Sequence, residues 1–238
     1  MSRDLVTSRQ LPSPRVFLSA ILLRADCQVH LTHRTTGLIL SSFAETFTAT
    51  INHEFLRITT VPLQPRFLAS LDKHHSKLTE MIRKKGGVVR EKTQNILKVL
   101  DQVVFYLEVS LKRECLLKCL MVYLGEDVES LIKEYLVSQK KEAEAELKAS
   151  TMAVFVIREN EDPLQSPHEI GIVLEGVEVL SELPSVAHAF AMLFGLIYAV
   201  NLSYPRKLKY TFDALQKIFM EIEPKKMTRK VCSLSVKL

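Results

Sequence analysis

The sequence predicts a mainly α-helical fold, a multi-helix bundle around a buried C-terminal helical hairpin, with a small two-stranded β ribbon. Three observations predict it. From Val186 to Val200 only His188 is polar, which is typical of a helix enclosed by protein or lipid. The break NLSYP and a second helix with a single apolar seam follow directly. Upstream, amphipathic helical patterns dominate, and only one region changes clearly to a strand pattern.

The apolar helix is too short to cross a membrane. Fifteen residues rise about 22 Å, less than the ~30 Å hydrocarbon core of a bilayer. We therefore expect the buried central post of a water-soluble domain and no membrane insertion. Pro184 suits the first turn, Asn201 suits the left-handed backbone that ends a helix, and Pro205 prevents continuation.

The second helix of the hairpin is expected between Pro205 and Pro224. Its apolar residues recur at steps of four and three, so they share one inward face: Leu208, Phe212, Leu215, Phe219 and Ile222. The polar residues between them are expected in water: Lys207, Lys209, Asp213, Gln216, Lys217 and Glu221.

The chain divides into three predicted parts. Residues 1–50 show no persistent period and predict a weakly structured N-terminal arm. Within the arm, Val16 to Leu23 has the apolar character of a signal peptide, but it is short, begins late and lacks a cleavage pattern, which disfavours secretion. Residues 51–223 are the helical domain, and residues 224–238 are a basic tail.

Further helices are predicted by periodicity at Arg66 to Lys85, Val88 to Asp101 and Leu107 to Leu124. The stretch EDVESLIKEYL predicts another helix, capped by Glu126 or Asp127. Its inward residues would be Val128, Leu131, Ile132, Tyr135 and Leu136. The charged run KKEAEAELK, residues 140–148, predicts a solvated helical face.

The strand pattern appears in one region. Residues 152–157, MAVFVI, are β-branched and aromatic, and residues 170–175 are a second candidate strand after a polar loop. Together they predict a two-stranded ribbon laid on the helices. Val177 to Leu180 either continues the second strand or begins a helix, and the spacing does not decide between them.

Composition is typical of a globular intracellular protein, cytoplasmic or nuclear. Of the 238 residues, 47% are hydrophobic, which is ample for a core, and the net charge of +5 is modest for a nucleic-acid binder. The four cysteines, Cys27, Cys115, Cys119 and Cys232, are scattered and form no disulfide framework.

No catalytic, cofactor-binding or metal-binding residues are predicted. Cys115 and Cys119 lie one helical turn apart and are expected to be inert core thiols with raised pKa values. His188 is expected to be neutral and bonded to a backbone carbonyl. HExxH, GxSxG, GxxxxGK[ST] and GxGxxG are all missing from the sequence, so no cofactor is expected and an enzyme is disfavoured.

Two basic groups are the candidate nucleic-acid contacts. Arg83, Lys84, Lys85, Arg90 and Lys92 bracket the Gly-Gly pair that ends a predicted helix, and Lys225, Lys226, Arg229 and Lys230 lie in the basic tail. The first group has a structural alternative, because cations stabilise the negative end of a helix dipole.

Several phrases resemble a multi-copy family of mostly uncharacterised vertebrate proteins, some labelled as sterile alpha motif domain-containing. The matching text covers roughly Ile51 to Leu238: INHEFLRITTVPLQPRFLASLDK, KKGG, KRECLLKCLMVYLGEDVESLIKEYL, MAVFVIRE, IGIVLEGVEVL and LFGLIYAVNLSYPRKLKYTFDALQKIF. The resemblance implies a C-terminal block that longer members join to an interaction or DNA-associated region, and it supplies no catalytic residues. Residues 1–50 depart from that pattern, so a truncated copy or an artefact of gene prediction is expected there.

These observations predict a non-catalytic, intracellular protein-interaction or scaffold module with an unknown protein partner. The alternative is a nucleic-acid-associated protein of mobile-element origin, motivated by the two basic groups and by the multi-copy character of the family. Binding to a generic duplex across a salt series separates the two, since phosphate contacts release counterions.

Overall fold

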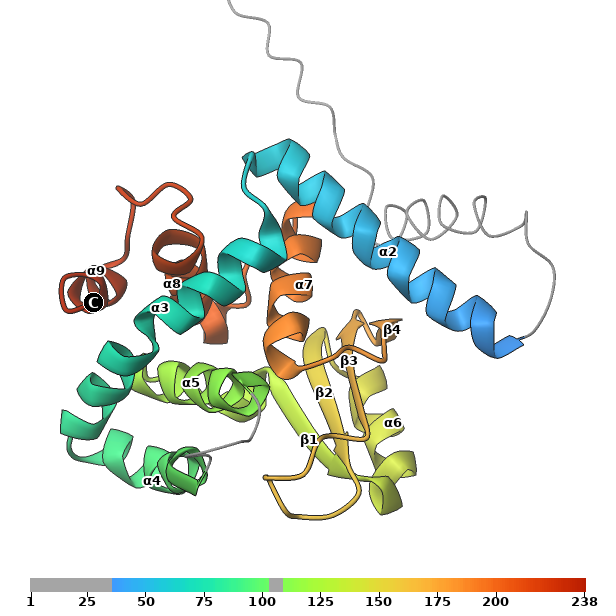
Figure 1. Cartoon of the computed structure of the whole chain (residues 1–238), viewed down its shortest axis with the longest axis horizontal. Coiled ribbons are helices and arrows are strands. Elements are labelled where there is room, and N and C mark those ends of the chain that lie inside the picture. The colour runs from blue at the N-terminus through green and yellow to red at the C-terminus, as the bar shows by residue number, and fades with distance from the viewer. Residues whose placement is uncertain (1–35, 103–108) are drawn as a thin grey trace, which may run out of the picture.

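The structure is a computed structural model that describes residues 36–102 and 109–238. Its described helices are α2 (Thr36–Thr59), α3 (Leu63–Lys84), α4 (Val88–Gln102), α5 (Val109–Tyr123), α6 (Lys140–Lys148), α7 (Val186–Ala199), α8 (Lys209–Ala214) and α9 (Arg229–Ser235). Its strands are β1 (Ile132–Leu136), β2 (Met152–Arg158), β3 (Glu169–Leu174) and β4 (Val177–Leu180). The mainly α-helical class is confirmed, and Figure 1 shows the helices gathered beside one small sheet.

The centre of the fold is α7, as its apolar sequence predicts. Phe190, Leu193, Phe194 and Ile197 are all buried, and α7 packs against α2, α3, α5, β2 and β3. Ser185 caps the helix, because its Oγ accepts the His188 N–H at 3.2 Å. Asn201 has a φ of 53°, the predicted left-handed ending. In the described part of the chain, no helix is both long and apolar enough to cross a membrane.

The prediction of a multi-helix bundle around a C-terminal helical hairpin is only partly correct. A helix apolar on every side needs neighbours on every side, so α7 lies between helices and a sheet face (Figure 1). The expected second helix is divided into a 3₁₀ turn at Arg206–Leu208, α8, and a π-helical segment at Leu215–Phe219. This unit packs against α3, α5 and α9.

The burial pattern along this second unit follows the predicted face in part. Ile222, expected to face inward, is half-buried, and so are Gln216 and Lys217, which were expected in water. Leu208, Phe212, Leu215 and Phe219 are buried. Asp213, expected in water, is buried too. Its carboxylate accepts the Thr228 N–H at 2.9 Å and pairs with Lys217 at 2.7 Å, and these contacts replace water.

Both ends of the predicted domain carry more structure than expected. Helix α2 begins at Thr36, inside the stretch expected to be a weakly structured arm, and Phe47 is fully buried. Residues 1–35 lie outside the described residues. At the other end, the basic tail contains α9, whose Val231 and Leu234 are buried in the main core. The apolar residues in each segment explain the difference, since burying them stabilises the helices.

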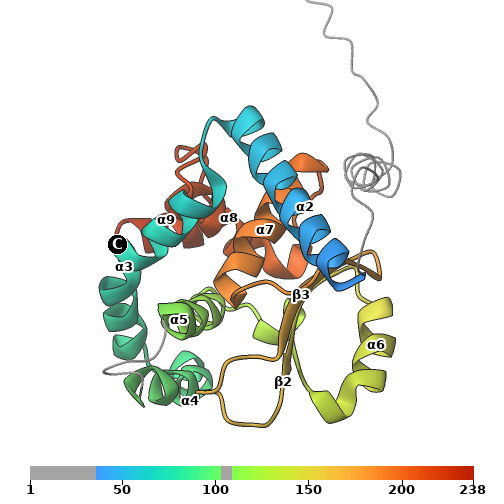
Figure 2. The ribbon, with the colours of Figure 1, turned by 45° about the vertical axis from the view of Figure 1, so that its right-hand side comes forward.

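The two-stranded ribbon is a four-stranded mixed sheet in the order β1-β2-β3-β4. β2 pairs antiparallel with β3 and β3 with β4, so Val177 to Leu180 is a strand. β1 pairs parallel with β2, from Ile132 opposite Val154 to Leu136 opposite Arg158. The parallel pair needs a crossover, which α6 provides. Figure 2 shows α6 and α7 on opposite sides of the sheet.

The predicted helix EDVESLIKEYL is wrong. Val128–Ser130 is a single 3₁₀ turn, and Ile132–Leu136 is strand β1. Its apolar spacing fits a helix and a half-buried strand about equally over so short a run, and its pairing partner lies about twenty residues later. Leu131 and Ile132 are buried in the main core, as the helical pattern also required.

Replacing Gly171 with alanine is expected to lower the free energy of unfolding by about 1–3 kcal/mol. A Cβ at this position would lie 2.3 Å from the Phe155 ring and 2.5 Å from the Leu180 carbonyl oxygen. Urea denaturation measures the change in the free energy of unfolding. Gly86→Ala is the matched control, because a Cβ there meets nothing within 4 Å, and it should be neutral or gain up to about 1 kcal/mol. Equal effects of the two variants would contradict the packing of β2, β3 and β4.

Candidate functional site

The first basic group is spread over the end of α3 and the start of α4. Arg83 forms an ion pair with Asp101, and Lys84 pairs with Glu80 at 2.5 Å. The side chains of Lys85, Arg90 and Lys92 are exposed and have no hydrogen-bond or ion-pair partner among the described residues. Two of the five predicted cations therefore already have acidic partners within the molecule.

The second basic group lies on and before α9. Lys226 pairs loosely with Glu223 at 3.7 Å. Lys230 donates to the Leu124 carbonyl at 2.7 Å and lies over the Tyr210 ring, 4.4 Å from its centroid. Lys225 and Arg229 are exposed. Because α9 packs against α8, whereas α4 packs against α3 and α5, the two groups occupy separate elements and form no common stripe.

The thiols and histidines behave as core or half-buried groups. Burial raises the pKa of both Cys115 and Cys119 to about 12, so neither is a thiolate at neutral pH. Burial, with a contribution from Arg113, lowers the pKa of His188. Its Nδ1 lies 2.8 Å from Ser185 Oγ, a hydroxyl partner and not the expected backbone carbonyl. Within residues 36–102 and 109–238, no three His, Cys, Asp or Glu side chains are arranged to hold a metal ion.

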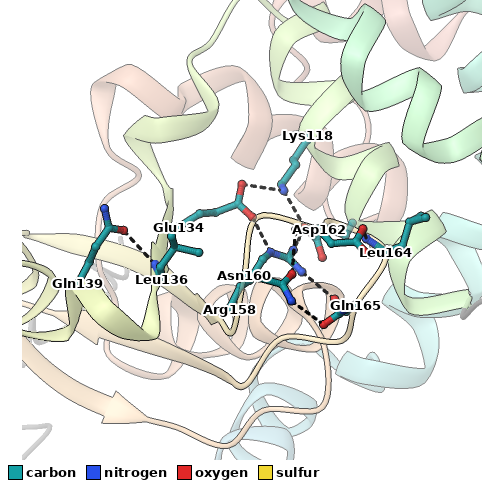
Figure 3. A network of polar contacts seen from close by, with 10 residues as sticks. Lys118, Glu134, Leu136, Gln139, Arg158, Asn160, Asp162, Leu164 and Gln165 are labelled. Atoms are coloured by element: carbon teal, nitrogen blue, oxygen red, sulfur yellow. Dashed lines mark hydrogen bonds and ion pairs between the residues drawn. The ribbon is translucent and has the colours of Figure 1, made fainter.

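A network of four charged residues joins α5 to the sheet (Figure 3). Glu114 accepts from Arg158 at 2.8 Å and from Lys118 at 2.6 Å. Glu134 on β1 accepts from Lys118 at 3.0 Å and from Arg158 at 3.3 Å. Arg158 also donates to the Gln165 carbonyl at 3.1 Å, which fixes the loop after β2. The four charges cancel, so we call this set the ion network.

Within the ion network, Lys118 and Glu134 are held in their ionised forms by neighbours of opposite charge. Burial disfavours the charged form of Lys118, but Glu114 and Glu134 outweigh it and raise the pKa of this amine. Burial likewise opposes ionisation of Glu134, and Lys118 and Arg158 still lower its pKa. Each charged group has a partner of opposite sign, so none is available as a general acid or base.

A groove of about 540 Å³ runs beside the ion network, along β1. Its walls come from five elements, namely α4, the end of α5, the 3₁₀ turn at Val128–Ser130, β1, and α6 through Glu146. Ile96, Val122 and Val128 supply apolar lining. We call this feature the β1 groove.

One edge of β1 has no strand beside it in the described structure. The Leu131 carbonyl accepts the Val154 N–H at 2.8 Å, so odd-numbered residues of β1 direct their backbone groups to β2. Ile132 and Glu134 therefore direct theirs outward, and no hydrogen bond to either N–H occurs among the described residues. The Leu136 N–H, by contrast, donates to Gln139 Oε1 at 3.0 Å.

Two acidic residues without an ion-pair partner among the described residues lie where β1 begins. Asp127 and Glu129 line the β1 groove, are exposed, and have no ion-pair partner among the described residues. Lys92 is the unpaired cation on the α4 wall. A neighbouring hollow of about 670 Å³ shares the two acids and is lined on its far side by Arg206 and Lys207.

A third hollow, of about 310 Å³, also borders the ion network. Glu114 and Arg158 line it, together with Ser110, His168 and Ser185. The two charged groups are paired with each other, and the Ser185 hydroxyl already contacts His188. The arrangement binds the loop between β2 and β3 to α5.

Sequence reasoning missed the ion network and the β1 groove. The spacing of Glu114 and Lys118, four residues apart on a helix, was a visible signal. Glu134 and Arg158 lie far from them in the chain, and Glu134 reaches them only because β1 is a strand. The sheet edge and the groove beside it exist only because Ile132–Leu136 is a strand and not part of the predicted helix EDVESLIKEYL.

Stability is expected to fall as pH decreases below about 6.5. Burial lowers the pKa of His188, so protonation at this histidine favours the unfolded chain. Burial opposes ionisation of Asp213, yet Lys217 and Thr228 lower its pKa below 3.8. The stabilisation from Asp213 is therefore complete above pH 3.8 and lost as pH falls through the folded pKa.

Urea midpoints measured from pH 7 to pH 2.5 check this dependence. Asp213→Asn should be less stable than the parent at pH 6, and the gap should close at the acid end of the series. A constant gap across the series would contradict the assignment of Asp213 as an ionised, hydrogen-bonded group.

Comparison of the chain with protein-family models, curated proteins and solved structures gives no match. The resemblance to the vertebrate family therefore stays a prediction. A role has to be inferred from the fold, the ion network and the β1 groove.

Proposed function

We propose that this protein is a non-catalytic, intracellular protein-interaction module that binds a partner protein at the β1 groove. The observation that carries the proposal is the unpaired outer edge of β1 opening into a partly apolar groove of about 540 Å³. Unsatisfied backbone groups and apolar lining are the features that recognise another polypeptide. The buried, unreactive thiols Cys115 and Cys119 fit a reducing compartment.

The pairing of the charged groups supports a non-catalytic role. Glu114, Lys118, Glu134 and Arg158 are the convergent titratable side chains, and each is bonded to a group of opposite charge. A general acid or base needs a pKa near the working pH and a free path to substrate. In the ion network, opposite charges hold each group in its ionised form and occupy its hydrogen-bonding positions, so neither requirement is met.

Nucleic-acid association remains the second candidate, favoured by the exposed Lys85, Arg90 and Lys92. Its weakness is geometric, because four of the nine predicted cations are already engaged, and the two groups occupy separate elements. A duplex is recognised mainly by a continuous basic surface.

Site-specific photo-crosslinking tests the proposal. The full chain, with a benzoylphenylalanine in place of Glu129, is expressed in vertebrate cells and irradiated. The control carries the same group in place of Lys141, an exposed residue of α6 away from the β1 groove. We expect discrete protein adducts only from the Glu129 position, and equal yields from both positions would contradict the role.

A duplex-binding measurement discriminates the second candidate. Fluorescence anisotropy with a generic DNA duplex is followed from 20 mM to 200 mM salt. Affinity that falls steeply with salt, and falls again in a Lys85→Ala/Arg90→Ala/Lys92→Ala variant, would favour nucleic-acid association over the proposed role.

A further inference from the structure

We propose that the β1 groove binds an extended peptide segment of another protein, which adds as a fifth strand beside β1 and carries apolar and basic side chains. This inference rests on the interaction role proposed above and specifies the chemistry of the partner. It follows from three properties of the groove: the direction of the backbone groups, the neutralised charges along the edge, and the unpaired acids at one end.

The backbone of β1 is ready to pair on its outer side. Ile132 and Glu134 direct their N–H and C=O groups away from β2. Five residues of strand extend over about 17 Å, so a peptide of about five residues can form the added ladder. At the far end, the Leu136 N–H is already bonded to Gln139, which limits the ladder to the first part of the strand.

The charged side chains of this edge do not repel a peptide in the way that edge charges usually do. Glu134 is paired with Lys118 and Arg158, and Lys133 is paired with Glu146 at 2.6 Å. Both charges are thereby neutralised within the molecule. An added strand meets a polar but uncharged edge.

The lining predicts the side chains of the peptide. Ile96, Val122 and Val128 face the groove from α4, α5 and the 3₁₀ turn, and they favour apolar side chains on that face of the added strand. Asp127 and Glu129 are unpaired where β1 begins, and they favour a Lys or Arg at that end of the peptide.

A second copy of this chain is a poorer occupant. The only basic residue of β1 is Lys133, and it is already paired with Glu146 at 2.6 Å. The β1 strand of a second copy therefore brings no free cation to Asp127 and Glu129. A partner peptide with its own Lys or Arg does.

The test begins with a random nonapeptide library displayed on phage and selected on the full chain. We expect enriched sequences that alternate apolar residues with Thr or Ser and carry Lys or Arg at one end. The best peptide is then synthesised with each amide N-methylated in turn. Methylating two alternate amides should weaken binding at least tenfold, whereas methylating the amides between them should leave affinity within twofold. Uniform sensitivity, or none, would overturn strand addition.

Protein variants test the charge complement. Asp127→Asn/Glu129→Gln should weaken the selected peptide about three- to tenfold and reduce the salt dependence of binding. The matched control is Glu142→Gln/Glu144→Gln on α6, which removes the same charge from two exposed residues that do not line the groove. Equal losses from both double variants would contradict recognition at Asp127 and Glu129.

The outcomes distinguish this inference from the role on which it rests. Cross-links at position 129 without the alternating N-methylation pattern would overturn strand addition and leave the interaction role standing. An alternating pattern without any cellular cross-link would contradict the interaction role alone. Sedimentation of the chain as a dimer that the peptide dissociates would show that a second copy is the occupant, contrary to the proposal.

Discussion

Replacing Phe194 with alanine is expected to lower the free energy of unfolding by about 3–5 kcal/mol. The side chain is fully buried in α7, with ring centroids of Phe55 at 5.7 Å, Tyr198 at 5.0 Å and Tyr204 at 6.5 Å. Truncation removes buried apolar area, leaves a cavity and breaks the aromatic contacts between α2, α7 and the segment before α8. Urea denaturation followed by circular dichroism measures the loss.

The control for this variant is Val88→Ala. Val88 is 64% exposed at the start of α4, so its truncation should change the free energy of unfolding by less than about 0.5 kcal/mol. A loss at Phe194 as small as the one at Val88 would mean that α7 is not enclosed as described.

Replacing Arg158 with methionine is expected to destabilise the fold by about 3 kcal/mol. Arg158 is buried at the end of β2 and bonds Glu114, Glu134 and the Gln165 carbonyl. Methionine fills a similar volume but leaves Glu114 and Glu134 to share Lys118, so the buried Glu114 lies beside an excess negative charge. The loss is measured by urea denaturation at pH 7.

A second change should restore much of that loss. Glu114→Gln in the Arg158→Met background removes the excess charge and leaves Lys118 paired with Glu134, so we expect at least half of the stability to return. The surface pair Arg57–Glu54 provides the comparison, because Arg57→Met should cause no measurable loss. Additive losses at Glu114 and Arg158 would contradict a coupled network.

The predicted elements that depended on local signals were largely correct. Val186 to Val200 was identified as a buried helix because its side chains are apolar on every side, and Val88 to Asp101 was identified because its apolar residues have a helical period. The chain break at Gly87 follows from the left-handed backbone that glycine adopts readily, and the break at Pro205 follows from the fixed φ and missing N–H of proline.

The elements that depended on distant partners were not predictable in the same way. Ile132, Tyr135 and Leu136 satisfy the spacing of a helix, and they form strand β1 because β2 is available beside them. Asp213 appeared to be a surface residue until α9 placed Thr228 next to it. A single sequence contains the pattern of such residues but not the neighbour that selects between two conformations of similar local energy.

The candidate site was predicted poorly for the same reason. The nine basic residues were chosen by proximity in sequence, and the structure distributes them over separate elements. The β1 groove draws Ile96, Val122, Val128 and the edge of β1 from four elements, so no contiguous motif indicates it.

By itself, the sequence determined a mainly helical domain with an apolar helix at its centre, because the apolar content and the hydrophobic period are properties of each segment alone. The tertiary structure decided that β1 is a strand, that no other strand of the described residues pairs with its outer edge, and that Glu114, Lys118, Glu134 and Arg158 meet. These features depend on contacts between residues far apart in the chain, and such contacts exist only after loops have closed and the core has packed.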